Sequence, residues 1–201
     1  MRVQRLIKAA CAAFALSVIY SVVPFQANCS GLYSNVFRLH ILANSDSQAD
    51  QELKLRVRDR VLNSTKQLFD SAENKYQAEK LVRDNLQSIA NTAYREVLDN
   101  GSTYTVTAEV TKMYFTTRRY KNYTLPSGTY DALRITIGSG KGHNWWCVMY
   151  PSLCVAPDIG EADDRAKNAL SENGYEVVRN ENTEYKFKIV EIFEKIRSFF
   201  S

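Results

Sequence analysis

The residues best suited to chemistry are a histidine and a cysteine four positions apart, His143 and Cys147. A thiol becomes a nucleophile when a base such as imidazole takes its proton, so this pair is the candidate catalytic set. Six residues separate Cys147 from Cys154, and Pro151 between them favours a turn that brings the two sulfurs together. We predict a Cys147–Cys154 disulfide, which would remove the thiolate and leave no catalytic residue.

The glycine-rich segment from Gly138 to Gly142 resembles a phosphate-binding loop only in composition. Lys141 is followed by Gly142, whereas a P-loop needs a Ser or Thr there to hold its metal ion. A turn between strands is the better interpretation. Two thiols and the chain's two histidines also match poorly with the four ligands of a closed zinc site. We therefore expect no metal and no cofactor.

Two stretches carry more polar and aromatic residues than a core requires. The first alternates in hydrophobicity from Phe37 and then turns polar at residues 44–46, which either present a polar surface or simply cap and turn the chain. The second contains the chain's two tryptophans side by side, which on a strand face opposite ways. An exposed tryptophan is a good contact for a partner. The predicted partner-binding residues are Arg38, His40, Asn44, Asp46, Trp145 and Trp146.

Hydrophobic periodicity predicts the elements that must hold these residues. Helical spacing predicts one helix over residues 47–69, with a capping-box start at Ser47, and a second over residues 73–98. Alternation predicts strands, the first two of which form an antiparallel pair with a long loop. The predicted strands cover residues 103–110, 133–137 and 145–150. The fold class is therefore α+β, with two helices packed on a small antiparallel sheet.

The first 28 residues have the pattern of a targeting segment. Arg2, Arg5 and Lys8 precede an uncharged apolar run that is shorter than a relaxed membrane-spanning helix. A cleaved signal peptide and an uncleaved membrane anchor both stay open, and either places the rest of the chain outside a membrane, where disulfides persist. Without these three cations the chain has nearly equal numbers of basic and acidic residues. This composition does not indicate the excess of positive charge that binds nucleic acid.

The chain beyond Cys154 is predicted to be a mostly helical extension. A helix is predicted over residues 160–170, an extended segment over 175–178 and a last helix over 184–200. The apolar side of the last helix either docks on the domain or contacts a membrane surface or partner. The predicted division is residues 1–28 as signal peptide or anchor, 34–155 as the main domain and 156–201 as the extension.

Two ordered motif blocks span roughly residues 36–154. The first runs from Arg38 to Asp46 and continues in Asp50-Gln51, Leu53-Lys54 and Val57-Arg58-Asp59. The second runs from Leu125 to Cys154 and includes Ala132-Leu133-Arg134-Ile135 and Asn144-Trp145-Trp146-Cys147-Val148. Through these blocks the chain resembles the stage II sporulation protein R family. It departs from the family pattern, in ways that affect local turns, at Thr116, Lys121, Tyr150 and Ser152.

This resemblance implies a function that composition does not. Such a protein is made in the forespore, is exported into the space between the two membranes and triggers a membrane protease of the mother cell. That protease resembles aspartic proteases and matures the precursor of sporulation sigma factor E. The resemblance therefore implies a non-catalytic activator whose partner supplies the catalytic carboxylates. The alternatives are an exported cell-wall hydrolase built on His143 and Cys147, and a structural envelope protein.

Overall fold

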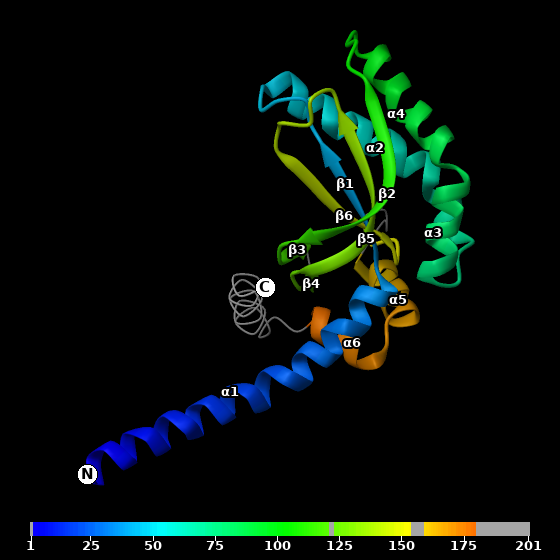
Figure 1. The fold of residues 1–201 in the computed structure, drawn as a ribbon. Coiled ribbons are helices and arrows are strands. Elements are labelled where there is room, and N and C mark those ends of the chain that lie inside the picture. Colours follow the sequence, from blue (N-terminus) through cyan, green and yellow to red (C-terminus); the bar gives the residue numbers. More distant parts are fainter. Residues whose placement is uncertain (1, 121–122, 154–158, 180–201) are drawn as a thin grey trace.

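The structure of the chain is a computed structural model that describes residues 2–120, 123–153 and 159–179 (Figure 1). Its centre is a four-stranded sheet in the order β2-β5-β1-β6. The strands are β1 (Phe37–Leu42), β2 (Val106–Phe115), β5 (Gly128–Ile137) and β6 (Asn144–Tyr150). A separate two-stranded hairpin joins β3 (Arg118–Tyr120) to β4 (Tyr123–Leu125). The predicted α+β class is confirmed.

The strand pairing contains one parallel pair in an otherwise antiparallel sheet. β2 and β5 are antiparallel, as predicted for the pair with a long loop, and β1 and β6 are also antiparallel. β1 and β5, however, run parallel, because the chain passes through a helical layer and β2 before it returns to the sheet. A parallel pair needs such a long connection, which periodicity along the sequence does not reveal.

Three helices cover one face of the sheet, which we call the helical face. They are α2 (Gln48–Asp70), α3 (Lys75–Asp84) and α4 (Leu86–Asp99). The core beneath them includes Leu39 and Ile41 of β1, Leu133 and Ile135 of β5, and Cys147 of β6. These are alternate residues of each strand, so the other set of side chains faces away from the helices.

The start of α2 has the serine half of the predicted capping box, while the Asp50 carboxylate binds residues before the helix. The Ser47 hydroxyl accepts a hydrogen bond from the Asp50 amide, with an N–O distance of 3.2 Å. The Asp50 carboxylate accepts from the side chains of Asn44 and Ser45. The cap therefore also ties the helix to the corner that precedes it.

Two predicted elements differ from the structure. The single helix over residues 73–98 is two helices, α3 and α4, that meet at Asn85. The extended segment over 175–178 is wrong, because these residues belong to helix α6 (Glu172–Arg179). The Ser171 hydroxyl accepts from the Gly174 amide at the start of α6, which favours a helix there. The predicted helix over 184–200 lies outside the described residues.

A second core lies under the lower part of the sheet's other face. It joins the end of the N-terminal helix α1 (Arg2–Asn35) to the β3–β4 hairpin, α5 (Ile159–Ala169) and α6. Figure 1 shows α1 running from the N-terminus into this group of helices. The helix predicted over residues 160–170 is confirmed by α5. Asp163 of α5 ties the group together, accepting hydrogen bonds from Tyr123 of β4 and from Tyr175 and Arg179 of α6.

The exposed part of α1 carries several apolar side chains, among them Leu6, Leu16 and Tyr20. In the described parts of the chain, no helix combines the length and the apolar character needed to cross a bilayer. The signal peptide or anchor over residues 1–28 stays a prediction, as does the division into three parts.

Candidate functional site

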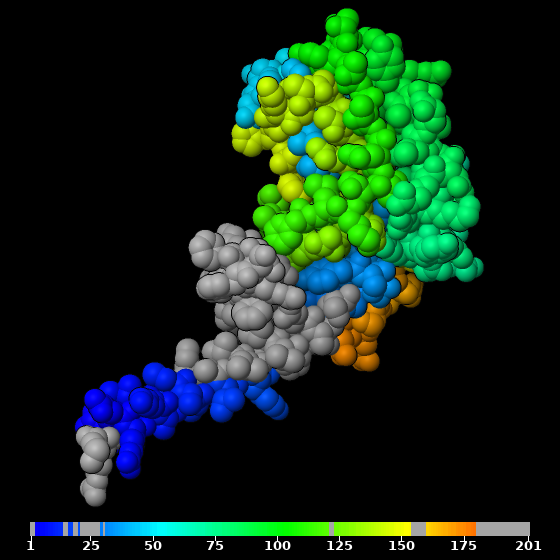
Figure 2. All heavy atoms as spheres, in the orientation of Figure 1, coloured from blue at the N-terminus to red at the C-terminus, as the bar shows by residue number. Residues whose placement is uncertain are grey.

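The upper part of the face turned away from α2, α3 and α4 carries one row of side chains that crosses all four strands. The strand registers pair Glu109 of β2 with Arg134 of β5, Arg134 with His40 of β1, and His40 with Trp146 of β6. We call these four residues the cross-strand row. Glu109 and Arg134 keep 58% and 41% of their side-chain surface exposed, and Trp146 is half-buried. Figure 2 shows atoms of β1, β5 and β6 at the surface in this region. Three of the four residues are thus accessible to another molecule, whereas His40 is only 4% exposed.

His40 is held in place at the centre of the row. Its Nε2 lies 2.8 Å from the amide oxygen of Asn144, and its ring centre lies 4.6 Å from that of Trp146. An amide oxygen only accepts, so Nε2 donates and the neutral ring leaves Nδ1 unprotonated. Burial lowers the pKa of His40, and the nearby charges of Arg134 and Arg38 add to this effect. The ring therefore favours the neutral form.

Arg38 lies one position below the row and has no exposed surface. Its guanidinium donates to the Tyr120 hydroxyl and stands 3.9 Å from the centre of the Phe115 ring and 5.0 Å from that of Tyr130. Its Nε and Nη1 atoms have no hydrogen-bond partner among the described residues. Burial lowers the pKa of Arg38. Because it is fully buried, Arg38 cannot contact a partner directly and can affect binding only by supporting the residues that cover it.

Asn44 and Asp46 lie at a corner between β1 and α2, next to the loop that joins β5 to β6. Asn44 donates to Asp50 over 2.9 Å, and its side-chain oxygen accepts from the Ser139 amide over 3.0 Å. Asp46 accepts from both the backbone amide and the Nδ1 of His143. The hydrogen bond from the His143 ring is the main reason that the pKa of Asp46 lies below its usual value. Both residues thus hold the corner together, while Asp46 stays half-exposed.

Two further contacts fix the loop against this corner. Lys54 of α2 is buried and donates to the His143 carbonyl over 2.8 Å. A side chain at Gly142 would meet the Ser45 carbonyl oxygen at 2.2 Å, so only glycine fits at this approach. The glycine-rich segment is therefore a turn between strands, as predicted.

The two tryptophans face opposite sides of the sheet, as the strand alternation predicts. Trp146 belongs to the cross-strand row, whereas Trp145 packs against the core of the helical face. The guanidinium carbon of Arg58 on α2 stands 4.9 Å from the Trp145 ring centre. The structure thus brings His40 and Trp146 together above Arg38, places Asn44 and Asp46 at the adjoining corner, and separates Trp145 from both groups.

The residues considered for catalysis do not form a pair. Cys147 is fully buried in the core of the helical face, whereas His143 is exposed and bound to Asp46. Residue 154 lies outside the described residues, so the Cys147–Cys154 disulfide stays a prediction.

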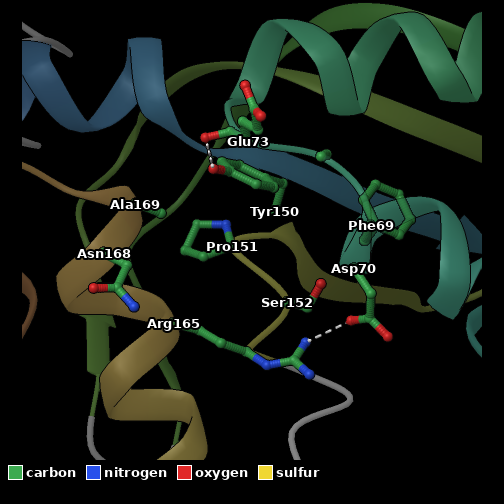
Figure 3. Close-up of a pocket in the computed structure, with 10 residues that line it drawn as sticks. Phe69, Asp70, Glu73, Tyr150, Pro151, Ser152, Arg165, Asn168 and Ala169 are labelled. Atoms are coloured by element: carbon green, nitrogen blue, oxygen red, sulfur yellow. Dashed lines mark hydrogen bonds and ion pairs between the residues drawn. The ribbon is translucent and has the colours of Figure 1, made fainter.

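A cavity of about 410 Å³ lies elsewhere, between the end of α2, the Tyr150–Pro151 segment and α5 (Figure 3). Arg165 of α5 reaches Asp70 of α2 across it, with an N–O distance of 3.3 Å, and the Tyr150 hydroxyl donates to the Glu73 carbonyl. Its lining residues are mostly bound to one another. None of the predicted partner-binding residues lines it.

Sequence reasoning missed two arginines and a glutamate at the row. Arg134 belongs to the second motif block, but no periodicity along the sequence places it beside His40. Arg118 of the hairpin has its guanidinium carbon 5.0 Å from the Trp146 ring centre, which brings a further cation to the row. Glu109 lies 3.6 Å from Arg134 and is the acidic member of the row. The alternation of each strand could have shown which face these residues take, but not their neighbours.

Comparisons with known proteins converge on one family. Residues 33–160, which include the whole cross-strand row, match the family model described as stage II sporulation protein R. The chain is 36% identical over 133 residues to stage II sporulation protein R of Bacillus subtilis strain 168. The alignment covers 66% of this chain and 55% of that protein, so the chain spans about half the length of this relative. No solved structure matches the chain.

Proposed function

Because the chain belongs to the stage II sporulation protein R family, we propose that it is an exported signal of endospore formation that activates a membrane-embedded aspartic protease. The family itself indicates a role in sporulation and is named for a stage of that process, not for an enzymatic activity. The proposed protease belongs to the mother cell and processes the precursor of sporulation sigma factor E. The chain itself is made in the forespore and acts from the space between the two membranes.

Family membership carries this proposal, and two features of the chain support it. The nucleophile candidate Cys147 is buried away from the base candidate His143, as a non-catalytic protein allows. The cross-strand row offers charged and aromatic side chains on an accessible surface, as a binding protein needs. The chain would activate its protease by binding the active conformation, or an active dimer, more tightly than the inactive form.

Reconstitution tests the proposal directly. The full chain, the protease and the sigma factor precursor are produced together in a host that does not sporulate, and precursor cleavage is followed by immunoblot. We expect cleavage to require both the chain and the protease, and to stop when a catalytic aspartate of the protease is replaced. Cleavage that is the same with and without the chain would show that the chain is not an activator.

Two companion measurements separate the alternatives. Thiol labelling of the folded chain tests the hydrolase alternative. A reactive Cys147 would support a hydrolase with a cysteine nucleophile, and an unreactive Cys147 would exclude it. Deletion of the chain from a sporulating cell addresses a purely structural role. A structural envelope protein would leave precursor processing intact, whereas an activator would not.

A further inference from the structure

We propose that the cross-strand row, together with Arg118, is the docking surface for a carboxylate-bearing segment of the partner. This inference rests on the proposed function, because the partner is the outer part of the membrane protease. It adds the place on this chain that is contacted and the chemistry of the segment that contacts it.

The two guanidinium groups on this surface have only one described carboxylate between them. Arg134 and Arg118 bring two guanidinium groups, each with five N–H donors, while Glu109 approaches Arg134 only to 3.6 Å. The Nε of Arg134 is buried and has no hydrogen-bond partner among the described residues. Within the described parts of the chain, no carboxylate forms an ion pair with Arg118. A partner's carboxylate would supply the acceptors that these guanidinium groups lack.

Two arginines on the helical layer have close carboxylate partners within the chain. Arg60 of α2 pairs with both Glu96 and Asp99 of α4, and Arg83 of α3 pairs with Glu79 one turn away. These charges are satisfied within the chain. At the row, by contrast, Arg134 and Arg118 share one carboxylate, and the buried charge of Arg38 lies just below them.

The row also offers an aromatic platform beside the cations. Trp146 is half-buried and rests against His40 on one side and Phe115 on another, so its position is fixed before a partner arrives. Arg118 stands over the same indole. Fixed aromatic side chains lose little entropy on binding and often dominate binding energy. A segment with an apolar or aromatic residue near its carboxylate would use both features.

The accessible surface ends below the row but continues above it. Below the row, the hairpin covers Arg38 through Tyr120. Above the row, Thr107 and Asn144 are exposed and Thr136 is half-buried, so the surface extends toward the loop that joins β5 to β6. A segment that contacts both Arg118 and Arg134 would therefore lie across the row, beside the hairpin.

Charge reversal tests the inference on the full chain. Binding of purified chain to the purified protease in detergent is measured for wild type, Arg134→Glu, Arg118→Glu, Arg134→Lys and Arg95→Glu. We expect either reversal at the row to weaken binding about tenfold or more, because a charged partner would then meet repulsion. Arg134→Lys keeps the charge and should lose less, since only the bidentate geometry is removed. Arg95 is an exposed arginine of α4 and serves as the matched control, with an expected change within about twofold.

The outcomes distinguish this inference from the proposed function. If the wild-type chain neither binds nor activates the protease, the proposed function fails. If wild type activates it and both reversals bind as wild type does, the activator stands and the docking surface is overturned. The same holds if the reversals weaken binding only to vesicles of phosphatidylglycerol and not to the protease. A lysine replacing one acidic residue of the protease should restore binding to Arg134→Glu and so identify the carboxylate.

Discussion

The guanidinium carbon of Arg38 lies 3.9 Å from the centre of the Phe115 ring, and neither side chain has any exposed surface. The ring attracts the cation, but Arg38 has one hydrogen-bond partner, Tyr120, while its Nε and Nη1 have none among the described residues. Removing a charge from water costs free energy that incomplete hydrogen bonding does not recover. The Arg38 side chain therefore packs well, but its buried charge lowers the stability of the fold.

Arg38 should accordingly tolerate an apolar replacement of similar length. We expect Arg38→Met to unfold at a free energy within about 1 kcal/mol of wild type, or above it, because the charge penalty is removed while the volume is kept. Arg38→Ala should lose roughly 2–5 kcal/mol, since it leaves a cavity. Chemical unfolding curves of the three proteins provide the comparison. A methionine variant as unstable as the alanine variant would show that the charge itself stabilises the fold.

His40 should make stability depend on pH just below neutrality. Burial lowers its pKa from the ordinary 6.5, so the unfolded chain takes up a proton before the folded chain does. Its contribution to stability is therefore complete above pH 6.5 and is lost as the pH falls through the lowered pKa. The difference in unfolding free energy between wild type and His40→Gln should shrink over this interval. The chain has two histidines, so His143→Gln is the control and also assigns the remaining ring signals in a titration by nuclear magnetic resonance.

Asp163 should control how α5 and α6 are held at acid pH. Hydrogen bonds, the strongest from the Tyr175 hydroxyl, lower the pKa of Asp163 to about 2, so the folded chain keeps this carboxylate charged after the unfolded chain has lost the charge. The resulting stability is present above about pH 4 and disappears as the pH falls toward 2. Amide exchange of α6 should be faster in Asp163→Asn at neutral pH and should approach wild type near pH 2. Asp164→Asn changes an exposed neighbour and should match wild type throughout.

Substitution of Asn44 should destabilise the fold, even though this residue lies at a candidate contact surface. Asn44→Ala removes the bonds to Asp50 and to the Ser139 amide, which should cost roughly 1–3 kcal/mol. Asn44→Asp should cost more, because it sets a second carboxylate beside Asp50. Thermal unfolding measures both, with the exposed Asn63→Ala of α2 as control. An unchanged melting temperature in Asn44→Ala would show that Asn44 does not stabilise the corner, and contact with a partner would be its remaining proposed role.

Features with a local cause were predictable from the sequence. The period of two along β6 fixes that Trp145 and Trp146 face opposite sides, and the polar run at residues 44–46 fixes a corner before a helix. The error at residues 175–178 also has a local cause. Four residues are too few to separate alternation from a helix face, and Tyr175 and Val178 are one helical turn apart and both buried.

Features that depend on strand order were not predictable. His40 and Arg134 meet only because β1 and β5 run parallel, and the chain between them passes through three helices and β2. Arginine is also among the residues least often fully buried, so no rule of composition places Arg38 inside the fold. The cross-strand row is therefore a product of topology, although each of its members occupies the face that alternation assigns to it.

The last turns of α1 set a boundary for any trimming of the chain. Among the side chains that the structure describes, Cys29 is the first along the sequence to be buried, and Leu32 and Tyr33 follow, with the Tyr33 hydroxyl donating to the Ser127 carbonyl. A peptidase that cut before residue 29 would keep all the described members of this core. A cut one turn later would remove residues that pack against α6 and the start of β5, so the fold itself sets how far such a cut can go.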